Sequence, residues 1–478
     1  MDYEELVKHQ LKNCGMKEAE KISAGNYSVY KVEKDKNLYA LKHVTYEPEF
    51  GIENLVEVDI VTRIIHPYII HAKEIITPLD CKMDGIGILL PLAQRTLYNF
   101  YMDPSVTLKE KLEVIYKIAC AINFLHQNGI LHLDVKDINV VLKKNHPYLI
   151  DFNLSMFASP ESEVISHYPR VTLFYRPPEN LKRRSGYYSN KTDVWSFGLV
   201  MLHTLASEPV VNKIPISYNG GREESVYTFV TTKLQEEDYI KSLLKNIDEE
   251  QKILCLDLIK QVLQVDPYKR ISMDKVCKHK LFDKFRDEVD REASKWIILE
   301  PEIKNLSYSS THVLTLLRLV ELAKKFSNFS FETLFLAVDL FKRTAGDLVK
   351  TEADEKILIV TCFFMAIKIL SFEIDIEVFV FHAKTLFPEV TEDDVINKEI
   401  EVVKNLRGII NVMTLYKTCK TGDEVLVTFK EVALNNDPKV YGLMTPNNLK
   451  VFLSERVKTS ELRKETLTIK DYFLKYNQ

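Results

Sequence analysis

The sequence predicts an α+β protein in which a region of mixed strands and helices precedes an all-α region. Residues 37–44 alternate polar and apolar side chains, which is typical of a half-buried strand. Residues 52–65 repeat apolar side chains at helical spacing. A new helical periodicity begins after residue 311, and its near-apolar run at 357–370 is too short to cross a bilayer, so it predicts a buried helix.

Two charged residues fall on the apolar faces of the first two elements. Lys42 shares its strand face with Ala40. Glu57 lies on the same helix face as Ile60 and Val61. Because an unpaired charge on an apolar face is costly, we expect each of the two side chains to have a partner of opposite charge. The alternative is that each is a snorkelling or surface side chain.

The strongest functional signal lies between residues 131 and 153. It places four polar residues at the spacing that phosphoryl transfer needs: Asp134, Lys136, Asn139 and Asp151. The first Asp can accept a hydroxyl proton, the Asn and the second Asp can hold Mg²⁺, and the Lys lies between them. This stretch resembles the catalytic loop of eukaryotic-type protein kinases.

Further segments resemble protein kinases in the order that the family requires. Residues 172–179 resemble the end of an activation segment, and residues 193–198 resemble the buried helix start that supports the catalytic loop. Arg270 stands where the family places a partner for the acidic residue Glu179. The resemblance implies a bilobal kinase fold.

The resemblance also implies a site for ATP and Mg²⁺. Lys42, paired with Glu57, would contact the ATP phosphates, Asp134 would orient and deprotonate the target hydroxyl, and Lys136 would steady the transferring phosphoryl group. Asn139 and Asp151 would hold Mg²⁺. Leu90 would be the gatekeeper beside the adenine, with residues 91–93 as the hinge. The residues expected to line the nucleotide are Ile22, Gly25, Val29, Ala40, Lys42, Leu90, Leu92 and Leu142.

Within the kinases, the resemblance is closest to the cyclin-dependent group. Residues 51–57 occupy the place of the helix segment that reads the cyclin, and residues 171–179 differ from that group's usual string at only a few positions. In that group, the arginine at the position of Arg176 shapes a pocket that favours proline after the target Ser or Thr. The resemblance therefore implies a proline-directed Ser/Thr kinase.

The sequence departs from the kinase pattern at three places. The phosphate-covering loop, residues 22–30, keeps one clear glycine, Gly25, which is expected to reduce ATP affinity. Asn153 replaces the glycine usual after Asp151-Phe152, a change that we expect to be tolerated because Asn adopts the left-handed region more readily than most residues.

The third departure concerns activation. Val56, Leu133 and Met156 stand at the positions of the three arginines that hold an activation-loop phosphate in this group. A phosphate near Ser166 would gain no bidentate arginine contacts. We therefore predict that activity does not depend on activation-loop phosphorylation.

The C-terminal third resembles a cyclin box, the helical module that activates cyclin-dependent kinases. The resemblance rests on residues 331–339, 358–368 and 397–399. It implies that Lys368 and Glu399 contact the kinase, whereas the alternative is a snorkelling lysine and a surface carboxylate. The expected domains are a kinase domain at 1–285 (N-lobe 15–92, C-lobe 93–285), a linker at 286–311, a cyclin-box-like domain at 312–410 and a helical tail at 411–478, a possible truncated second repeat.

These features predict an ATP-dependent protein Ser/Thr kinase activated by its own cyclin-like domain. Docking within one chain and docking between two chains both stay open. The alternative is a pseudokinase scaffold whose cyclin-like part captures a separate kinase. The single-chain fusion, with its Lys-, Asn- and Ile-rich composition, resembles what large DNA viruses encode.

Charge and cysteine usage narrow the remaining possibilities. The 478-residue chain has a formal net charge of −4 with both signs mixed, which makes no general case for nucleic-acid binding. Its seven cysteines form no C-x-x-C pair, as is typical of reduced intracellular proteins. The acidic N-terminus is not a secretory signal, and no segment predicts a membrane span. We expect an intracellular protein, cytoplasmic or nuclear, that acts on protein substrates.

Overall fold

The computed structural model divides the chain into two compact units, residues 1–44 with 56–299 and residues 45–55 with 300–478. Each unit is described by itself. The structure describes residue 12 and residues 15–22, 28–44, 54–76, 86–157, 164–166, 170–181, 186–214, 221–299, 319, 322, 326, 331–370 and 374–406. Gly25, residues 300–311 of the predicted linker and residues 411–478 of the predicted tail lie outside these ranges.

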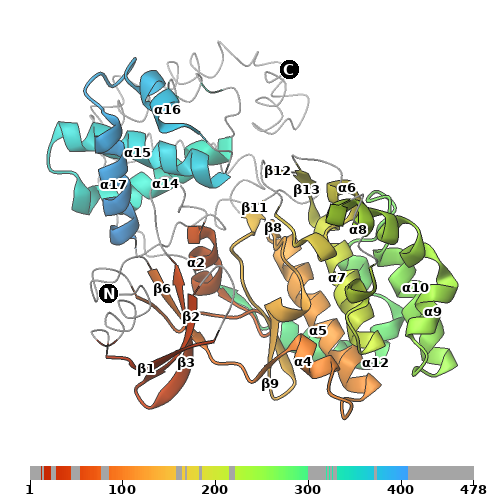
Figure 1. Ribbon diagram of the computed structural model, residues 1–478. Coiled ribbons are helices and arrows are strands. Elements are labelled where there is room, and N and C mark those ends of the chain that lie inside the picture. Colours follow the sequence, from red (N-terminus) through yellow and green to blue (C-terminus); the bar gives the residue numbers. More distant parts are fainter. Residues whose placement is uncertain are drawn as a thin grey trace. The chain divides into compact units, whose positions relative to one another are not determined.

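The first lobe of the first unit is built on an antiparallel sheet, which Figure 1 shows beside helix α2. Its five described strands, in the order β1-β2-β3-β6-β5, are β1 (Lys17–Lys21), β2 (Ser28–Lys34), β3 (Asn37–Val44), β6 (Ile86–Pro91) and β5 (Glu74–Ile76). The predicted strand at 37–44 is confirmed as β3. Tyr30, Leu41 and Leu89 are buried together in the core of this lobe.

Helix α2 (Asn54–Arg63) follows the sheet strands β1–β3 and leads into the two-residue strand β4 (Ile64–Ile65). The predicted helix at 52–65 is confirmed for residues 54–63, but its last two residues are wrong, because residues 64 and 65 form β4 and take their hydrogen bonds from another strand. Its described side chains from Leu55 to Val61 are all buried, including the acidic Glu57 and Asp59. A helix buried on all these positions can hold a carboxylate only if a cation or hydrogen-bond donor meets it.

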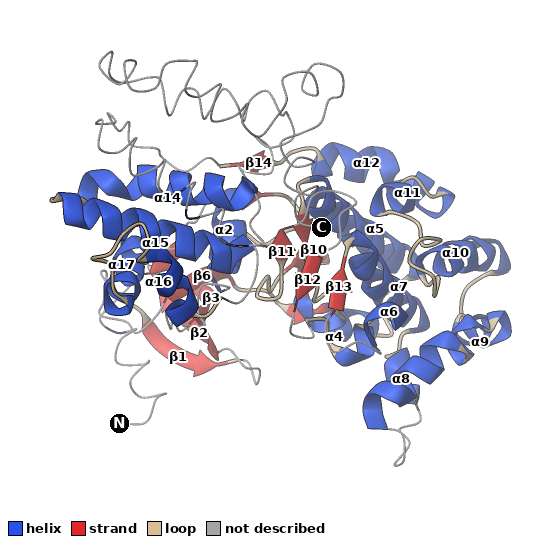
Figure 2. Cartoon of the chain, turned by 90° about the horizontal axis from the view of Figure 1, so that it is seen from above, coloured by secondary structure: helices blue, strands red, loops and turns tan. Residues whose placement is uncertain are grey.

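The second lobe is mainly helical, as the blue helices of Figure 2 show. Helix α5 (Leu108–Gln127) begins with a capping box between Thr107 and Glu110, and it packs against α7 (Asn190–Ala206). The other helices described before residue 283 are α4 (Leu97–Tyr101), α6 (Pro178–Leu181), α8 (Gly221–Thr231), α9 (Glu237–Leu243), α10 (Glu249–Val262) and α11 (Met273–Cys277).

The second lobe also contains short strands and 3-10 turns. The strands are β7 (Arg95–Thr96), β8 (Ile130–Leu131), β9 (Val140–Lys143), β10 (His146–Leu149), β11 (Met156–Phe157), β12 (Val164–Ser166) and β13 (Gly186–Tyr188). The 3-10 turns are η1 (Asp137–Asn139), η2 (Leu173–Tyr175), η3 (Val210–Lys213), η4 (Lys233–Gln235) and η5 (Lys280–Phe282).

The first unit continues beyond residue 285, where the kinase resemblance ends. Helix α12 (Asp283–Ala293) runs through that boundary and packs on α5. Strand β14 (Ile297–Ile298) then pairs with β4 at the end of α2, and the ring of Trp296 lies 5.2 Å from that of Phe124. Residues 296–299, within the predicted linker, thus pack on the kinase unit. Sequence could not name the partner, because a two-residue strand carries no periodicity of its own.

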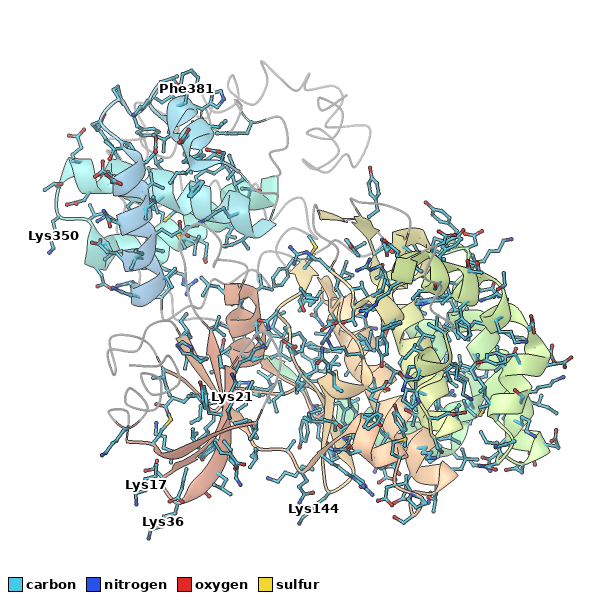
Figure 3. All side chains as sticks on the ribbon, viewed as in Figure 1. Lys17, Lys21, Lys36, Lys144, Lys350 and Phe381 are labelled. Carbon is cyan, nitrogen blue, oxygen red and sulfur yellow. The ribbon has the colours of Figure 1, made fainter. Side chains whose placement is uncertain are left out.

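The second unit is helical where it is described. Its helices are α14 (Phe331–Leu348), α15 (Glu352–Leu370), α16 (Ile376–Ala383) and α17 (Glu392–Asn405). Helix α15, the predicted buried helix, packs against α14 and α17. Phe381, labelled on α16 in Figure 3, is 71% exposed. Among the described helices, none combines the length and the hydropathy that a membrane span requires.

Candidate active site

The strand lysine and the helix glutamate form the expected ion pair. Lys42 Nζ donates to Glu57 Oε2 at 2.6 Å and to Asp151 Oδ1 at 2.7 Å. Lys42 is 5% exposed and Glu57 is 1% exposed, so the pair is shielded from water. One ammonium thus connects the sheet, helix α2 and the turn after β10.

Burial and charge compete in this cluster. Burial works to lower the pKa of Lys42, but the carboxylates of Glu57 and Asp151 outweigh it and raise that pKa above its usual value. Burial works to raise the pKa of Asp151, but the Lys42 ammonium holds it below its usual value. Burial raises the pKa of Glu57, against the opposing effect of Lys42. Lys42 therefore stays charged at neutral pH.

Phe152 fixes the turn against the same helix. Its side chain is fully buried, and its ring lies 4.9 Å from the ring of His132. Its backbone N–H donates to Glu57 Oε1 at 3.3 Å. Burial lowers the pKa of His132, which keeps this ring neutral against an apolar neighbour. The backbone hydrogen bond to Glu57 therefore holds the turn of Asp151 close to α2.

The catalytic loop brings its polar groups together. Lys136 Nζ donates to Asp134 Oδ2 at 2.6 Å, and Asn139 Nδ2 donates to the same oxygen at 2.8 Å. Thr172 Oγ1 donates to Asp134 Oδ1 at 2.6 Å and accepts from Lys136 Nζ at 3.1 Å. Asp134 thus lies among donors that keep its carboxylate in one orientation.

Sequence reasoning missed the contact of Thr172 with this carboxylate. Thr172 is the first residue of the stretch that resembles the end of an activation segment, and the sequence gives it no catalytic role. It lies 38 residues from Asp134, so no local pattern connects the two. The available signal was the resemblance itself, since the kinase family places this segment beside the catalytic loop.

Asp193 supports the catalytic loop through hydrogen bonds to its backbone, as predicted. Its carboxylate is fully buried and accepts the backbone N–H groups of His132 and Leu133, each at 2.8 Å. Leu133 has a φ of +60°, an uncommon conformation for a branched side chain. The second of these hydrogen bonds fixes Leu133 in that conformation and so sets the direction of the chain into Asp134.

The predicted pairing of Arg270 with Glu179 is also confirmed. Arg270 donates to Glu179 through both terminal nitrogens, at 2.8 and 3.0 Å. The guanidinium lies 5.0 Å from the ring of Trp195, and Arg270 is 1% exposed. This bidentate pair anchors the end of the activation segment to the helical lobe.

A buried polar cluster, unanticipated from the sequence, lies under the catalytic loop. Asp137, next to Lys136, accepts from Tyr101 Oη at 2.5 Å, and His203 Nδ1 lies 3.1 Å from the same oxygen. Burial and the Asp137 charge raise the pKa of Tyr101. The cluster ties η1 to α4 and α7, and its members lie too far apart in the sequence to show a spacing.

The residues predicted for Mg²⁺ fit a hard oxygen-liganded cation. Among the described residues, the side-chain hydrogen bonds of Asn139 all use its amide nitrogen, which leaves its oxygen to act as a ligand. Those of Asp151 all use Oδ1, which leaves Oδ2. Carboxylate and amide oxygens are the ligand types that Mg²⁺ prefers.

Asn153 has a different role from the one expected. The left-handed conformation falls on Asp151, with a φ of +66°, and not on Asn153. Asn153 Nδ2 instead donates to Asp151 Oδ1 at 2.6 Å, while its own Oδ1 is buried with no hydrogen-bond partner among the described residues. The tolerance argument was therefore wrong in its reason, because the strained residue is the aspartate.

The strand register collects several residues predicted to line the nucleotide. Val29 pairs with Lys42 across β2 and β3, and Ala40 pairs with Leu90 across β3 and β6. Leu142 is buried in β9 and pairs with Arg95 of β7. Leu92 is half-buried after β6, and Ile22 is 45% exposed after β1.

An apolar cluster occupies the region of the missing arginines. Leu133 packs in one cluster with Val171 and Tyr188, and Met156 packs against it. The backbone of β12 in the activation segment pairs with β13. Val56, at the third arginine position, is buried in α2. These contacts are apolar or between backbone groups.

The guanidinium of Arg176 forms hydrogen bonds with the chain segment that precedes it. Its Nε and Nη2 donate to the carbonyl oxygen of Val171 at 3.1 and 3.0 Å. Its Nη1 lies 3.4 Å from Glu223 Oε1 on α8. The Val171 carbonyl therefore already has two donors.

In the second unit, the predicted lysine and glutamate meet each other. Lys368 Nζ donates to both oxygens of Glu399, at 2.6 and 2.8 Å, and lies 4.6 Å from the ring centre of Phe364. The Lys368 side chain is 8% exposed and that of Glu399 is 1% exposed. The alternative of a surface carboxylate is wrong, because Glu399 is buried against α15.

Comparison with known proteins agrees with the geometry of the first unit. The protein kinase domain family model matches residues 16–282. The chain is 28% identical over 276 residues to mouse serine/threonine-protein kinase ULK3, covering 55% of this chain and 54% of the relative. It is 26% identical over 312 residues to a probable CTD kinase subunit alpha homolog of Encephalitozoon cuniculi, covering 61% and 91%.

A third relative is cyclin-dependent kinase G-2 of Oryza sativa subsp. indica, 28% identical over 294 residues and covering 55% of this chain and 40% of the relative. The chain thus spans about half the length of ULK3 and less of the rice kinase. The family match covers more than half of the chain and coincides with the lobes described above. The chain belongs to the protein kinase family, and ULK3 among these relatives is named a serine/threonine-protein kinase.

Proposed function

We propose that this protein transfers the γ-phosphoryl group of ATP to Ser or Thr of protein substrates, as a kinase of the cyclin-dependent type. The observation that carries the proposal is the closed Lys42–Glu57–Asp151 cluster beside an ordered Asp134. Lys42 reaches Asp151, in the turn proposed to bind Mg²⁺, where it would contact the phosphates. Bound Mg²⁺ would neutralise charge on the phosphates, with Asn139 and Asp151 as its ligands.

The residues around Asp134 supply the rest of the reaction. The substrate hydroxyl would take the place of Thr172 Oγ1 at Asp134 Oδ1, since both are hydroxyl donors to one carboxylate oxygen. Asp134 would accept the proton as the hydroxyl oxygen attacks the γ-phosphorus and the bond from that phosphorus to ADP breaks. Lys136 would stabilise charge on the transferring group. The intact cluster favours catalysis over a scaffold role.

Replacing Asp134 by Asn tests this proposal. Asn keeps the shape of the side chain but cannot take up the proton, so phosphoryl transfer to a peptide mixture should fall by about two to four orders of magnitude. The thermal midpoint should stay near that of the wild type. Turnover within tenfold of the wild type would remove Asp134 from this role.

We also propose that the kinase is proline-directed. The Val171 carbonyl is occupied by Arg176 and cannot readily accept a backbone N–H of the substrate. A proline after the phosphoacceptor has no N–H to leave unpaired, so it loses nothing at this position. Profiling the wild type and Arg176→Met on a peptide library checks this. The wild type should enrich proline and the variant should not; absence of enrichment in the wild type contradicts the proposal.

Activity is proposed to be independent of activation-loop phosphorylation. The apolar cluster of Leu133, Val171 and Tyr188 and the β12–β13 pairing support this, since these contacts of the segment require no phosphate group. Phosphatase-treated protein should be as active as protein incubated with an activating kinase. A tenfold or larger rise on phosphorylation would overturn the proposal.

The C-terminal unit is proposed to act as a built-in cyclin-like activator. The support is the sequence resemblance together with the buried Lys368–Glu399 pair, since in cyclins these two positions grip the kinase backbone. In the full-length chain, Lys368→Met with Glu399→Leu replaces the pair by apolar side chains of similar size, a change that is often neutral for stability. Activity should nevertheless fall at least about tenfold.

Lys398→Met is the matched control for this pair. Lys398 lies next to Glu399 in the sequence and pairs with the exposed Glu401 at 2.7 Å. Its loss should leave activity near that of the wild type. Equal activity of the double variant and the wild type would exclude a cyclin-type role of the pair while leaving the kinase proposal intact.

A further inference from the structure

A cavity of about 720 Å³ lies within the first unit, beside the residues expected to form the hinge. Its lining comes from four places: residues between 65 and 73, the hinge residues 91–93, the β9–β10 hairpin, and Glu292 with Lys295 near the end of the unit. Its volume falls in the range of about 300–1,000 Å³ that is typical of ligand sites. The cavity can therefore hold a small ligand or a few residues of a peptide.

Strand β9 separates this cavity from the predicted nucleotide site. Val141 and Lys143 line the cavity, whereas Leu142, between them, is the residue expected to lie against the nucleotide. Successive side chains of a strand point to opposite faces of its sheet. A ligand in the cavity would therefore not compete with ATP.

The charge of the lining is mainly positive. Three exposed lysines, Lys73, Lys143 and Lys295, line the cavity, and Glu292 is the single acidic side chain among the described residues of the lining. The three lysines form no ion pair with any other residue that the structure describes. Because the whole chain has a formal net charge of −4, this local excess of positive charge does not follow from composition.

The carboxylate of Glu292 already has partners within the protein. Tyr68 Oη donates to Glu292 Oε2 at 2.6 Å, and His146 Nδ1 lies 3.9 Å from Glu292 Oε1. His146 Nε2 in turn lies 2.9 Å from the carbonyl oxygen of Pro67, which fixes the ring. Glu292 is thus held by the protein, and the lysine ammonium groups remain available to an anionic ligand.

The cavity also has apolar walls. Ile69 and Ile70 are almost fully buried, whereas Ile65 is 36% exposed and Leu92 is half-buried. Covering such side chains is favourable because it removes apolar area from water on both partners. Lysines and apolar walls together suit a ligand that carries both acidic and apolar groups, as a peptide segment with Asp or Glu beside Leu, Ile or Val does.

We propose that this cavity binds an acidic peptide segment of a protein partner. Asp or Glu side chains of the segment would meet Lys73, Lys143 and Lys295, and an apolar side chain would pack against Ile65 and Leu92. The occupant is argued from charge complementarity and from the mixed lining. The inference goes beyond the proposed kinase function, because no step of phosphoryl transfer uses this cavity.

Fluorescence polarisation with the full-length chain tests the inference. The probe is a fluorescently labelled peptide of alternating Glu and Leu, compared with the same peptide carrying Gln in place of Glu. At low ionic strength the acidic peptide should bind at least about tenfold more tightly, and added salt should weaken its binding. Lys143→Glu should reduce the affinity at least about fivefold, because an attractive contact becomes repulsive. Mg-ATP should not displace the probe.

Lys144→Glu is the matched control. Lys144, labelled in Figure 3, directly follows Lys143 and is exposed, but it does not line the cavity. This variant makes the same change of charge and should keep the wild-type affinity within about twofold. Equal binding of the two peptides, an equal loss of affinity in the two variants, or displacement of the probe by Mg-ATP would overturn the inference.

A short single-stranded oligonucleotide serves as a competing polyanion. It should bind more weakly than the acidic peptide, because its phosphate backbone offers no apolar side chain to Ile65 and Leu92. Tighter binding of the oligonucleotide, with the same dependence on Lys143, would contradict the choice of a peptide. Because every readout is binding and not turnover, a failure here is distinguishable from a failure of the kinase proposal.

Discussion

Lys42 and Glu57 meet at 2.6 Å between strand β3 and helix α2, both almost fully buried. The pair sets the distance between the sheet and the helix, and the same ammonium also reaches Asp151. Because its partners come from two other elements, a shift of any one of the three moves the other two. The geometry of the proposed nucleotide site therefore depends on this contact.

Replacing Glu57 by Gln should reduce phosphoryl transfer by about 100-fold or more, because Lys42 loses its charged partner and is drawn to Asp151 alone. Lys42→Met should reduce it at least as far. The measurement is kcat/KM for a generic peptide substrate. Lys34→Met removes a more exposed ion pair with Glu74 on the same sheet and should leave kcat/KM within a few-fold of the wild type.

Asn153→Gly should weaken Mg²⁺ binding, because Asp151 loses a hydrogen bond that orients its carboxylate. The variant removes the hydrogen bond from the Asn153 amide to Asp151 Oδ1, worth about 0.5–1.5 kcal/mol. The Mg²⁺ concentration that half-saturates ATP binding should rise by about 2- to 12-fold. Thermal shift titrations with ATP and increasing Mg²⁺ measure it; an unchanged midpoint would show that Asn153 does not orient Asp151.

Leu133→Ala should destabilise the activation segment. Leu133 is 1% exposed in the cluster with Val171 and Tyr188, so its truncation leaves a cavity that costs about 2–5 kcal/mol. Chemical denaturation measures the loss, and limited proteolysis should cut the segment faster than in the wild type. Leu38→Ala, at a leucine that is 51% exposed, is the control and should change neither measurement appreciably.

His66 should make the stability of the kinase unit depend on pH. Burial lowers the pKa of His66 from 6.5 to about 4, and its Nδ1 accepts the backbone N–H of Tyr68. The folded-state pKa of His66 lies below the unfolded-state value. The contribution of the neutral His66 to the free energy of unfolding is therefore fully present above pH 6.5 and is lost as the pH falls toward 4. At about 1.4 kcal/mol per pH unit, it amounts to roughly 3 kcal/mol.

Denaturation at a series of pH values measures this loss. His66→Asn keeps an acceptor for Tyr68 but does not titrate, so its unfolding free energy should fall less steeply between pH 6.5 and 4 than that of the wild type. Parallel curves for the two proteins would exclude His66 as the titrating group.

Much of the kinase unit could be predicted from local sequence. The alternation of residues 37–44 gave strand β3 with its bounds, and the helical spacing of 52–65 gave α2. Both place a charge on a buried face, so each charge was expected to need a partner, whereas the contact between Lys42 and Glu57 followed from the kinase resemblance. The pairing of Arg270 with Glu179 followed only from resemblance, since 91 residues separate them.

Other contacts could not be predicted, because the local sequence around each residue gives no indication of its distant partner. Thr172 reaches Asp134 across 38 residues, and Asp137 meets His203 across 66. Neither Thr172 nor Asp137 differs in its local sequence from an ordinary loop residue. The role of Asn153 depended on the backbone conformation of Asp151, which a residue type alone does not fix.

The sequence by itself determined the order of the catalytic residues and the two periodic elements that carry Lys42 and Glu57, because spacing and burial are local properties of the chain. Only the tertiary structure decided that residues 296–299 return to the end of α2, where β14 pairs with β4 and Leu299 bonds to Arg63. The physical reason is that a short strand obtains its hydrogen bonds from a partner, and the partner lies more than 200 residues away, at a distance of 236 positions for the Arg63–Leu299 contact.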